Sequence, residues 1–303
     1  MSRKIAVTGA FSYTGKYITR RLLDQGCEVI TLTGHPDRPD PFGGRVQVFP
    51  FNFEDLTALS NSLKGVTTLY NTYWVRFGRG VNTHERAVMY TRRLIHAAEA
   101  AGVKRIVHVS ITNPDIHSPL PYFRGKALLE EAIRASQLSY AILRPTVLFG
   151  AEDILINNIA FLLRHFPFFI IPGDGRYRLQ PIYVEDFADL AVAAGNRRDN
   201  SIQDAVGADA FTFEEMVRLI AARIRRPARL IHLPPRLALL ASQVVSMFVG
   251  DVVLTQDEVK GLMAGLLVSK EKPLGKKRLG DWLEANQEQV GMRYASELTR
   301  HYK

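Results

Sequence analysis

Short β-branched runs alternate with amphipathic stretches along the first 150 residues, and this alternation constrains the fold more than any other feature. The predicted strands are Lys4–Thr8, Glu28–Thr33, Arg45–Phe49, Thr67–Tyr70, Arg105–Ser110 and Tyr140–Arg144. The predicted helices between them are Thr14–Gln25, His84–Ala101 and Lys126–Ser136. Apolar strands separated by helices are typical of a parallel sheet that is covered on both faces. We therefore predict an α/β fold with a doubly wound, Rossmann-type parallel sheet.

The pattern changes after Gly150. We expect residues 1–150 to form the sheet domain, and residues 151–303 to form a smaller, mainly helical lobe that does not fold independently. Residues 151–170 look helical, and Gln180–Val184 looks extended. Asp186 is placed to cap the helix that follows it. Phe211–Ile224 is a predicted helix, opened by Thr212 and Glu215 as a capping box.

Composition narrows the class of protein. The single cysteine, Cys27, excludes an internal disulfide and a multi-cysteine metal site, and the eight histidines show no metal-ligand spacing. We predict no metal, and a cytoplasmic or otherwise reducing compartment. No apolar run reaches the ~18 residues of a transmembrane helix. The net charge of +9 favours anionic partners, but the basic residues are scattered and follow no nucleic-acid motif, so we expect no nucleic-acid partner.

The turn after the first strand has the spacing of a dinucleotide-phosphate loop. A pyrophosphate binds at such a place because free N–H groups and the helix dipole point at the anion. Gly9 allows the tight turn, and Gly15 lets the helix pack close to the strand. Ser12 stands where a middle glycine is usual, and its hydroxyl can donate to a phosphate. The predicted contacts are Gly9, Phe11, Ser12, Tyr13, Thr14 and Gly15.

The end of the second strand bears on the choice of cofactor. An acid there would bind the adenosine ribose and select NAD, whereas this strand ends in Thr33, Gly34 and His35. His35 and Arg38 can accept a 2′-phosphate, so we predict a preference for NADP(H) over NAD(H). Asp37 is the counter-argument, and the two basic residues can equally be solvated loop residues.

A tyrosine and a lysine, Tyr122 and Lys126, stand four residues apart after the fifth strand. On a helix they lie on one face, about one turn apart. A lysine ammonium near a phenol stabilises the phenolate, so the tyrosine becomes a usable general acid or base towards a carbonyl or alcohol.

With these motifs in this order, the chain resembles the short-chain dehydrogenase/reductase superfamily in its extended, epimerase-like branch. The resemblance covers most of residues 3–190 and includes the turn at Gly9–Gly15, the Tyr122–Lys126 pair, Leu143–Pro145 and Gln180–Asp186. Within that branch it is similar to the NADPH-binding accessory subunit of respiratory complex I, which binds nucleotide without known turnover. The segment from Phe149 to Ala160 is shared with that group.

The resemblance implies roles for individual residues. Tyr122 would be the acid/base, and Lys126 would tune it and bind the nicotinamide ribose. Further expected cofactor contacts are Asn52 and Phe53 at the adenine, Thr72 and Tyr73 after the fourth strand, and Pro145 and Val147 near the nicotinamide. The family also has a serine or threonine just after the fifth strand, where this chain has Ile111; Ser110 and Thr112 flank it and are the remaining candidates.

The substrate is expected to be a small molecule that the sequence does not identify. Trp74 and Arg76 follow the fourth strand, where ligands gather in a parallel sheet. In the second lobe, Asn157, Asn158, Arg176 and Arg178 lie where this branch contacts substrate. Simple packing remains the alternative for each of them.

Leu237–Val249 is almost wholly apolar. As a helix it can close the core of the second lobe, or dock on a membrane surface or a protein partner. Two functions stay open: an NADP-dependent oxidoreductase or epimerase that uses Tyr122, and a non-catalytic NADPH-binding sensor, assembly or accessory protein. Ile111 and the apolar segment favour the second.

Overall fold

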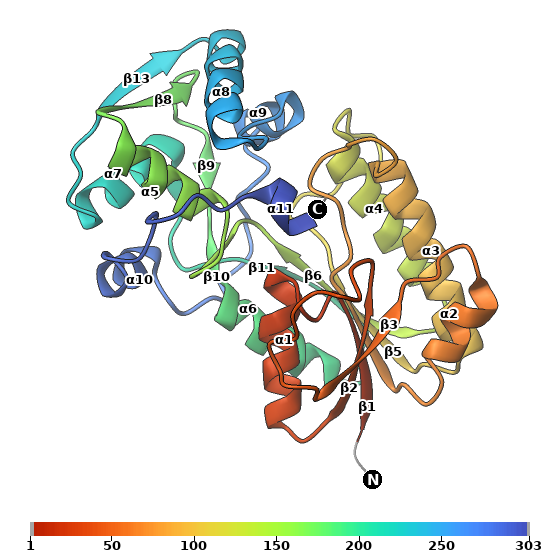
Figure 1. Ribbon diagram of the computed structural model, residues 1–303. Coiled ribbons are helices and arrows are strands. Elements are labelled where there is room, and N and C mark those ends of the chain that lie inside the picture. Colours follow the sequence, from red (N-terminus) through yellow and green to blue (C-terminus); the bar gives the residue numbers. More distant parts are fainter. Residues whose placement is uncertain (1–2, 302–303) are drawn as a thin grey trace. The chain divides into compact units, whose positions relative to one another are not determined.

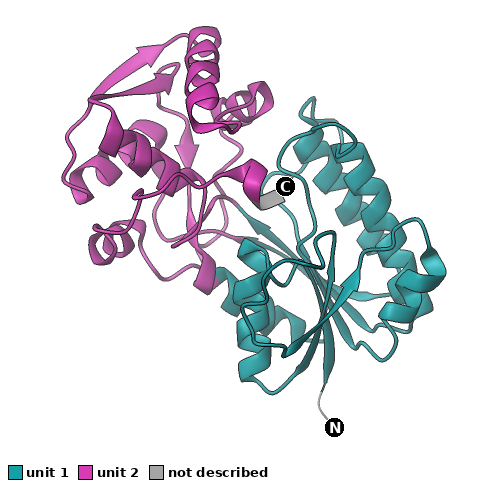
Figure 2. Ribbon diagram, in the orientation of Figure 1, with its two compact units in different colours: residues 1–145, 187–204 teal, residues 146–186, 205–303 magenta. Residues whose placement is uncertain are grey.

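The computed structural model describes residues 3–301, and the chain forms two compact units (Figure 2). The first unit holds the residues up to Pro145 together with Phe187–Asp204, and the second holds Thr146–Asp186 and the chain from Ala205 onward. The sequence placed a single boundary at residue 150. In the structure the chain leaves the first unit after Pro145 and returns to it once.

The first unit is built on a seven-stranded sheet with the order β3-β2-β1-β4-β5-β6-β11 (Figure 1). Its strands are β1 (Lys4–Thr8), β2 (Glu28–Thr33), β3 (Val46–Pro50), β4 (Thr68–Asn71), β5 (Arg105–Val109), β6 (Ser139–Pro145) and β11 (Ser201–Ala205). Neighbouring strands from β3 to β6 are parallel. The predicted doubly wound parallel sheet is confirmed.

Five helices cover this sheet: α1 (Tyr13–Asp24), α2 (Leu56–Ser62), α3 (His84–Ala100), α4 (Pro121–Ala135) and α6 (Val184–Gly195). Figure 1 shows α1 and α6 on one face, and α2, α3 and α4 on the other. Helix α2 was not predicted. Helix α4 begins five residues before the predicted Lys126, because Pro121 suits the first helical position. One core lies under α2, α3 and α4, with Leu59, Leu94 and Ile133 from the helices packed on Ile30, Leu69 and Ile106 of the strands.

The returning segment is tied into the sheet by a buried arginine. Arg105 is 4% exposed, and it donates from Nε to the Ala194 carbonyl (3.0 Å) and from Nη2 to the Asp199 carbonyl (3.0 Å). Tyr140 N–H donates to the Asn200 side chain at 2.9 Å. Gly195 leaves space that Tyr70 fills, since a Cβ there would lie 1.8 Å from the tyrosine oxygen.

The second unit has its own apolar core. Helices α5 (Leu155–His165), α7 (Phe213–Arg223) and α10 (Leu279–Ala285) enclose it, with Phe149 and Trp282 in contact. Three strand pairs accompany them: β7 (Leu148–Phe149) with β10 (Ile182–Tyr183), β9 (Arg178–Leu179) with β12 (Phe211–Thr212), and β8 (Phe168–Pro172) with β13 (Arg229–Leu233). The remaining helices are α8 (Pro235–Val249), α9 (Gln256–Met263) and α11 (Glu297–His301).

Two local predictions in this unit were wrong and one is confirmed. The helix expected over residues 151–170 ends at His165, because Phe168–Pro172 pairs with β13, far along the chain. Asp186 is not a cap: α6 begins at Val184, and the Asp186 carboxylate accepts the N–H groups of Lys276 and Lys277. The capping box of Thr212 and Glu215 is present. No helix among residues 3–301 is long and apolar enough to cross a membrane.

Candidate functional site

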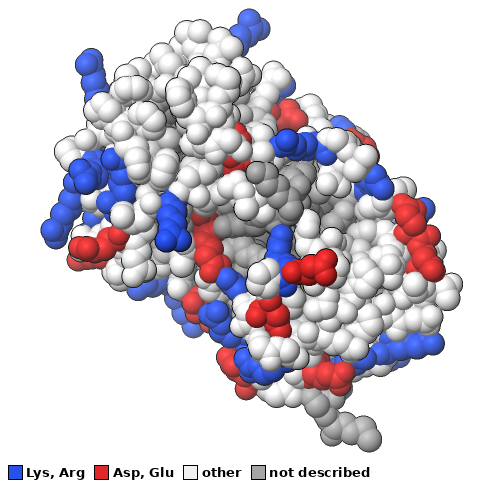
Figure 3. Space-filling view, in the orientation of Figure 1, with Lys and Arg blue, Asp and Glu red and all other residues white. Residues whose placement is uncertain are grey.

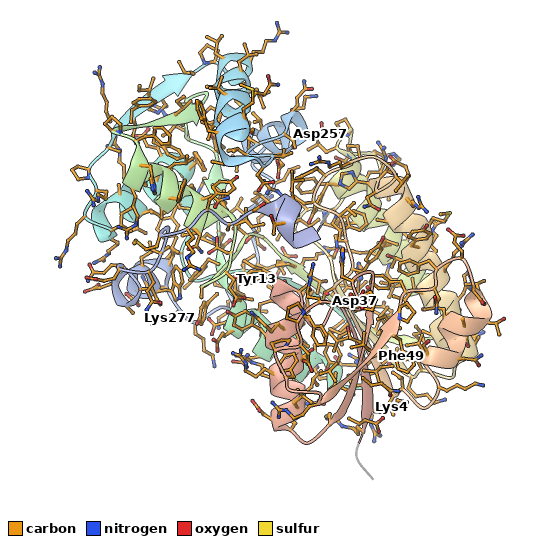
Figure 4. All side chains as sticks on the ribbon, viewed as in Figure 1. Lys4, Tyr13, Asp37, Phe49, Asp257 and Lys277 are labelled. Atoms are coloured by element: carbon orange, nitrogen blue, oxygen red, sulfur yellow. The ribbon has the colours of Figure 1, made fainter. Side chains whose placement is uncertain are left out.

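The turn between β1 and α1 has the backbone geometry that its glycines predict. Gly9 has φ +63°, in the left-handed region. A Cβ on Gly15 would lie 2.1 Å from the Gly9 carbonyl oxygen, so only glycine lets α1 start this close to the turn. In the side-chain view of Figure 4, Tyr13 at the start of α1 lies toward the carboxyl ends of the strands, opposite Lys4 at the start of β1.

The Ser12 side chain is hydrogen-bonded within the turn. Its hydroxyl donates to the Gly9 carbonyl at 2.6 Å, within the turn, and does not cap α1. The first turn of α1 also contains no acid. The residues therefore fit a phosphate, because the N–H groups and the positive end of the helix dipole are not neutralised by the helix's own cap.

The turn after β4 is bonded to the turn after β1. Thr72 N–H donates to Thr8 Oγ1 (2.7 Å), and the Thr72 hydroxyl donates to the Thr8 carbonyl (2.6 Å). The Thr8 hydroxyl in turn lies 3.2 Å from Asn71 Oδ1. These bonds fix the ends of β1 and β4 next to each other at the carboxyl edge of the sheet. A dinucleotide would lie along this edge.

The loop after β2 carries the residues predicted to select the cofactor. Gly34 is exposed, and His35 and Arg38 are half-buried, with the Arg38 N–H donating to the His35 carbonyl. Asp40 holds the next turn through the N–H groups of Phe42 and Gly44. Asp37 is exposed in this loop (Figure 4).

Aromatic rings stack beside this loop. Phe53, predicted to meet adenine, is 7% exposed and is stacked between Phe51 and Tyr90, with ring centres 4.5 Å apart on each side. Asn52 has φ +46°, and Tyr73 packs against both phenylalanines. Phe51 is less buried and is the nearest neighbour of Gly34. The ring closest to the adenosine side of the loop is therefore Phe51, which the sequence did not single out.

Tyr122 and Lys126 lie in the first turns of α4, as their spacing predicts. Tyr122 is half-buried, whereas Lys126 is 2% exposed and donates from Nζ to the Val109 carbonyl at 2.7 Å. Burial lowers the pKa of Lys126 to about 7, with Glu130 opposing the shift. The lysine is thus an interior group, fixed to the end of β5.

Trp74 closes over this lysine. Lys126 Nζ lies 4.5 Å from the centre of the indole, and the ring edges meet Tyr122 and His84 at centre distances of 5.6 and 5.7 Å. Trp74 Nε1 is buried and has no hydrogen-bond acceptor within the described part of the chain. Arg76, two residues on, lies over the Phe77 ring.

The hydroxyls next to Ile111 are enclosed in the protein. Ser110 donates to Glu130 Oε1 at 2.6 Å, and Glu130 is paired through two contacts with Arg144. Ile111 is 5% exposed, and Thr112 is fully buried with its N–H on the Pro145 carbonyl. Both candidates beside Ile111 are thus enclosed in the protein, and a role for either of them towards substrate stays a prediction.

A histidine that the sequence did not single out lies between these parts. His108 is fully buried, and its Nδ1 lies 3.0 Å from the Asn71 amide nitrogen. Its Nε2 has no partner among the described residues. Burial, together with the charge of Lys126, holds the pKa of His108 well below its ordinary value. A lone histidine in the apolar run Arg105–Ser110 was the available signal.

Comparison with known proteins agrees with this geometry. The sequence model of an NAD(P)H-binding family matches residues 9–157. The chain is 26% identical over 284 residues to NADH dehydrogenase (ubiquinone) 1 alpha subcomplex subunit 9, mitochondrial, of Arabidopsis thaliana, covering 87% of this chain and 70% of that protein. The chain is thus similar to NAD(P)H-binding, epimerase-like proteins of the short-chain dehydrogenase/reductase type.

Two solved structures share the fold. An NADPH-dependent quinone oxidoreductase of Escherichia coli, in complex with NADPH, superposes with a TM-score of 0.77 and 22% identity, covering 93% of this chain and 99% of that one. A nucleoside-diphosphate-sugar epimerase of Staphylococcus aureus superposes with a TM-score of 0.76 and 16% identity, covering 94% and 100%. The same fold therefore occurs in a quinone oxidoreductase and in a sugar epimerase.

The predicted substrate residues of the second unit differ in their surroundings. The Asn157 side chain is hydrogen-bonded to Gly150, Asp153 and Gly291. The Asn158 side chain is hydrogen-bonded to the N–H and the carbonyl of Ala295. These bonds hold the chain that follows α10, and a substrate contact by either asparagine stays a prediction. Arg176 and Arg178 are exposed, and Val147 packs on the core of the second unit; their roles stay predictions.

Proposed function

We propose that the protein is an NADP(H)-dependent oxidoreductase or epimerase that acts on a carbonyl or alcohol, with Tyr122 as general acid/base. The observation that carries the proposal is the placement of Tyr122 at the start of α4, one turn before a lysine that is fixed to the end of β5. Both residues belong to the edge formed by the carboxyl ends of the strands, where this fold binds its ligands.

Different segments of the chain would bind different parts of the cofactor. The turn from Gly9 to Thr14 would hold the pyrophosphate with backbone N–H groups. Phe51 and the loop from Gly34 to Arg38 would border the adenosine. Bound nicotinamide supplies or accepts a hydride, and this is the only chemistry that the cofactor adds.

Tyr122 would move the proton. Its hydroxyl donates to the substrate oxygen when a carbonyl is reduced, and accepts the proton in the reverse direction. Protonated Lys126 favours the phenolate because a positive charge lies one helical turn away. Fixed to Val109, Lys126 would act chiefly through its charge and less through contact with the cofactor.

The preference for NADP(H) rests on the loop after β2. No acid stands at the strand end, and Arg38 and His35 can meet a 2′-phosphate. Thermal unfolding with NADPH, NADP⁺, NADH and NAD⁺ tests this: a ligand at ~100 times its Kd adds about 2.7 kcal/mol. We expect a larger shift with the phosphorylated pair, and Arg38→Ala should reduce that difference. Equal shifts in the wild type would refute the preference.

Catalysis is tested with Tyr122→Phe. We expect this variant to lose NADPH oxidation with a panel of quinones, aldehydes and ketones, while its NADPH-induced thermal shift stays nearly unchanged. Full activity in the variant would remove Tyr122 from the mechanism.

A second candidate is nucleotide binding without turnover, in a sensor, assembly or accessory protein. The observation in its favour is that the Ser110 hydroxyl donates to Glu130 and that the next residue, Ile111, is apolar. The second hydroxyl that would donate to the substrate oxygen beside Tyr122 is then missing. Losing such a donor costs about 2–4 kcal/mol of transition-state stabilisation. Tight NADPH binding with no oxidation by any carbonyl of the panel would select this candidate.

A further inference from the structure

Helix α8 presents an apolar face to solvent. Five large apolar side chains on it are between 49% and 84% exposed: Leu237, Leu240, Val244, Met247 and Phe248. At 100° per residue they fall within an arc of about 100°, so they form one stripe along a helix about 22 Å long. We call these five residues the α8 stripe. Contiguous exposed apolar surface of this kind marks an interaction site in soluble proteins.

The opposite face of α8 accounts for its place in the second unit. Ala238 is buried, and the helix packs on β8 and β13. The stripe is therefore not the side that builds the core, although the apolar sequence alone suggested a core helix as one alternative. In Figure 3 the surface over α8 and β13 is almost entirely uncharged, with charged side chains at its margins.

A groove runs beside the stripe, between α8 and α9. It has a volume of about 390 Å³, an apolar floor that includes Leu239, Val259 and Met263, and two cations, Arg236 and Lys260, in its lining. By helical position Arg236 lies between the groove and the stripe. Both cations are exposed.

The charged residues of α8 and of the groove lining have one sign. Helix α8 contains an arginine and no acid. Asp257, the exposed acid of α9 (Figure 4), is not among the residues that line the groove, and Glu258 is used by the Thr255 cap. An apolar stripe and an apolar groove, each bordered by a cation, match the arrangement of an anionic phospholipid, whose chains are apolar and whose headgroup is negative.

We propose that α8 docks this protein on an anionic phospholipid surface. The α8 stripe enters the boundary between headgroups and acyl chains, Arg236 and Lys260 meet the lipid phosphates, and the groove takes apolar lipid surface. This docking is independent of the reaction at Tyr122, since all of its residues belong to the second unit.

Vesicle flotation with the full chain tests the proposal. We expect binding to vesicles made of equal parts of phosphatidylcholine and phosphatidylglycerol, little binding to phosphatidylcholine alone, and weaker binding as salt is raised. The double variant Met247→Ser/Phe248→Ser should lower the partition about tenfold. Arg236→Gln/Lys260→Gln should remove most of the preference for the charged vesicles.

Matched controls separate docking from folding. Met292→Ser changes an apolar residue of the same unit that is 59% exposed, and it should bind vesicles as the wild type does. All variants should keep the wild-type melting temperature and nucleotide response, because only exposed side chains change.

Three results would overturn the proposal. The first is absence of binding to either vesicle, and the second is equal binding to both. The third is self-association, measured by analytical ultracentrifugation, that the stripe variant abolishes in the absence of lipid; the stripe would then bind a second copy of the chain.

Discussion

Lys126 Nζ lies 4.5 Å from the centre of the Trp74 indole, and Gly125 makes this approach possible. Without a side chain at position 125, the indole can lie against α4 and cover the ammonium. The ring face and the Val109 carbonyl together replace part of the hydration that Lys126 loses on burial. The lysine is thus held by its neighbours before any ligand arrives.

Gly125→Ala should displace the indole. The new Cβ would lie 2.6 Å from Trp74 Cη2 and 3.2 Å from Val88, so the ring must move. We expect a loss of about 1–3 kcal/mol in the free energy of unfolding, with altered near-UV circular dichroism. Gly280→Ala is the control, because it lies in a helix and its nearest atom is 3.8 Å away. An unchanged tryptophan signal in Gly125→Ala would contradict the arrangement.

The buried lysine should make stability depend on pH. Its pKa falls from an ordinary 10.5 to about 7 on folding, so between these values the unfolded chain binds more protons. Stability contributed by this group therefore rises with pH across that window, by at most about 1.4 kcal/mol per pH unit. Lys126→Met removes this dependence. Urea unfolding of both proteins at about pH 7 and pH 9 should show that the wild type gains stability relative to the variant as pH rises. A stability difference that stays constant would argue against a lysine whose pKa is lowered by burial.

Ser110 should matter for stability more than for turnover. Its hydroxyl is bonded to Glu130, so Ser110→Ala should cost about 1–3 kcal/mol while leaving NADPH binding and any carbonyl reduction near the wild-type level. Glu130→Gln should cost more, about 3 kcal/mol, since it also removes the charge partner of Arg144. If Ser110→Ala lost turnover at unchanged stability, the serine would have to contact substrate.

Gly15→Ala should abolish nucleotide binding. Its Cβ would meet the Gly9 carbonyl at 2.1 Å, which forces α1 away from the turn. We expect the NADPH-induced thermal shift to disappear while the protein still unfolds cooperatively. The shift should survive in Gly280→Ala, and its survival in Gly15→Ala would place the phosphate elsewhere.

The parts that the sequence predicted best are those that depend on neighbours along the chain. The strands β1 to β6, the turn at Gly9 and the Thr212–Glu215 box follow from local patterns. Strand β8 was mistaken for helix because its partner Arg229–Leu233 lies some sixty residues away, and no local signal reveals that pairing.

In the candidate site, too, the sequence predicted local spacing but not tertiary contacts. The spacing of Tyr122 and Lys126 put them on one helix face, but it could not show that Val109 and Trp74 enclose the lysine. Ser110 and Asn157 are polar residues at positions where a substrate contact can be expected. Only the folded chain reveals that Ser110 is hydrogen-bonded to Glu130, and Asn157 to Gly291. A hydroxyl or amide has no preferred partner in sequence, so its role is decided by tertiary contacts.

The return of residues 187–204 to the first unit affects the order in which a growing chain can fold. When residue 150 leaves the ribosome, β6 is an open sheet edge, and the acceptors of Arg105 at Ala194 and Asp199 have not been made. The nucleotide-binding unit is finished only after the intervening piece of the second unit has been synthesised. A shortened gene that stops at the apparent end of the first half should therefore yield an aggregation-prone fragment, and the second unit's first segment is in effect an insertion inside the first.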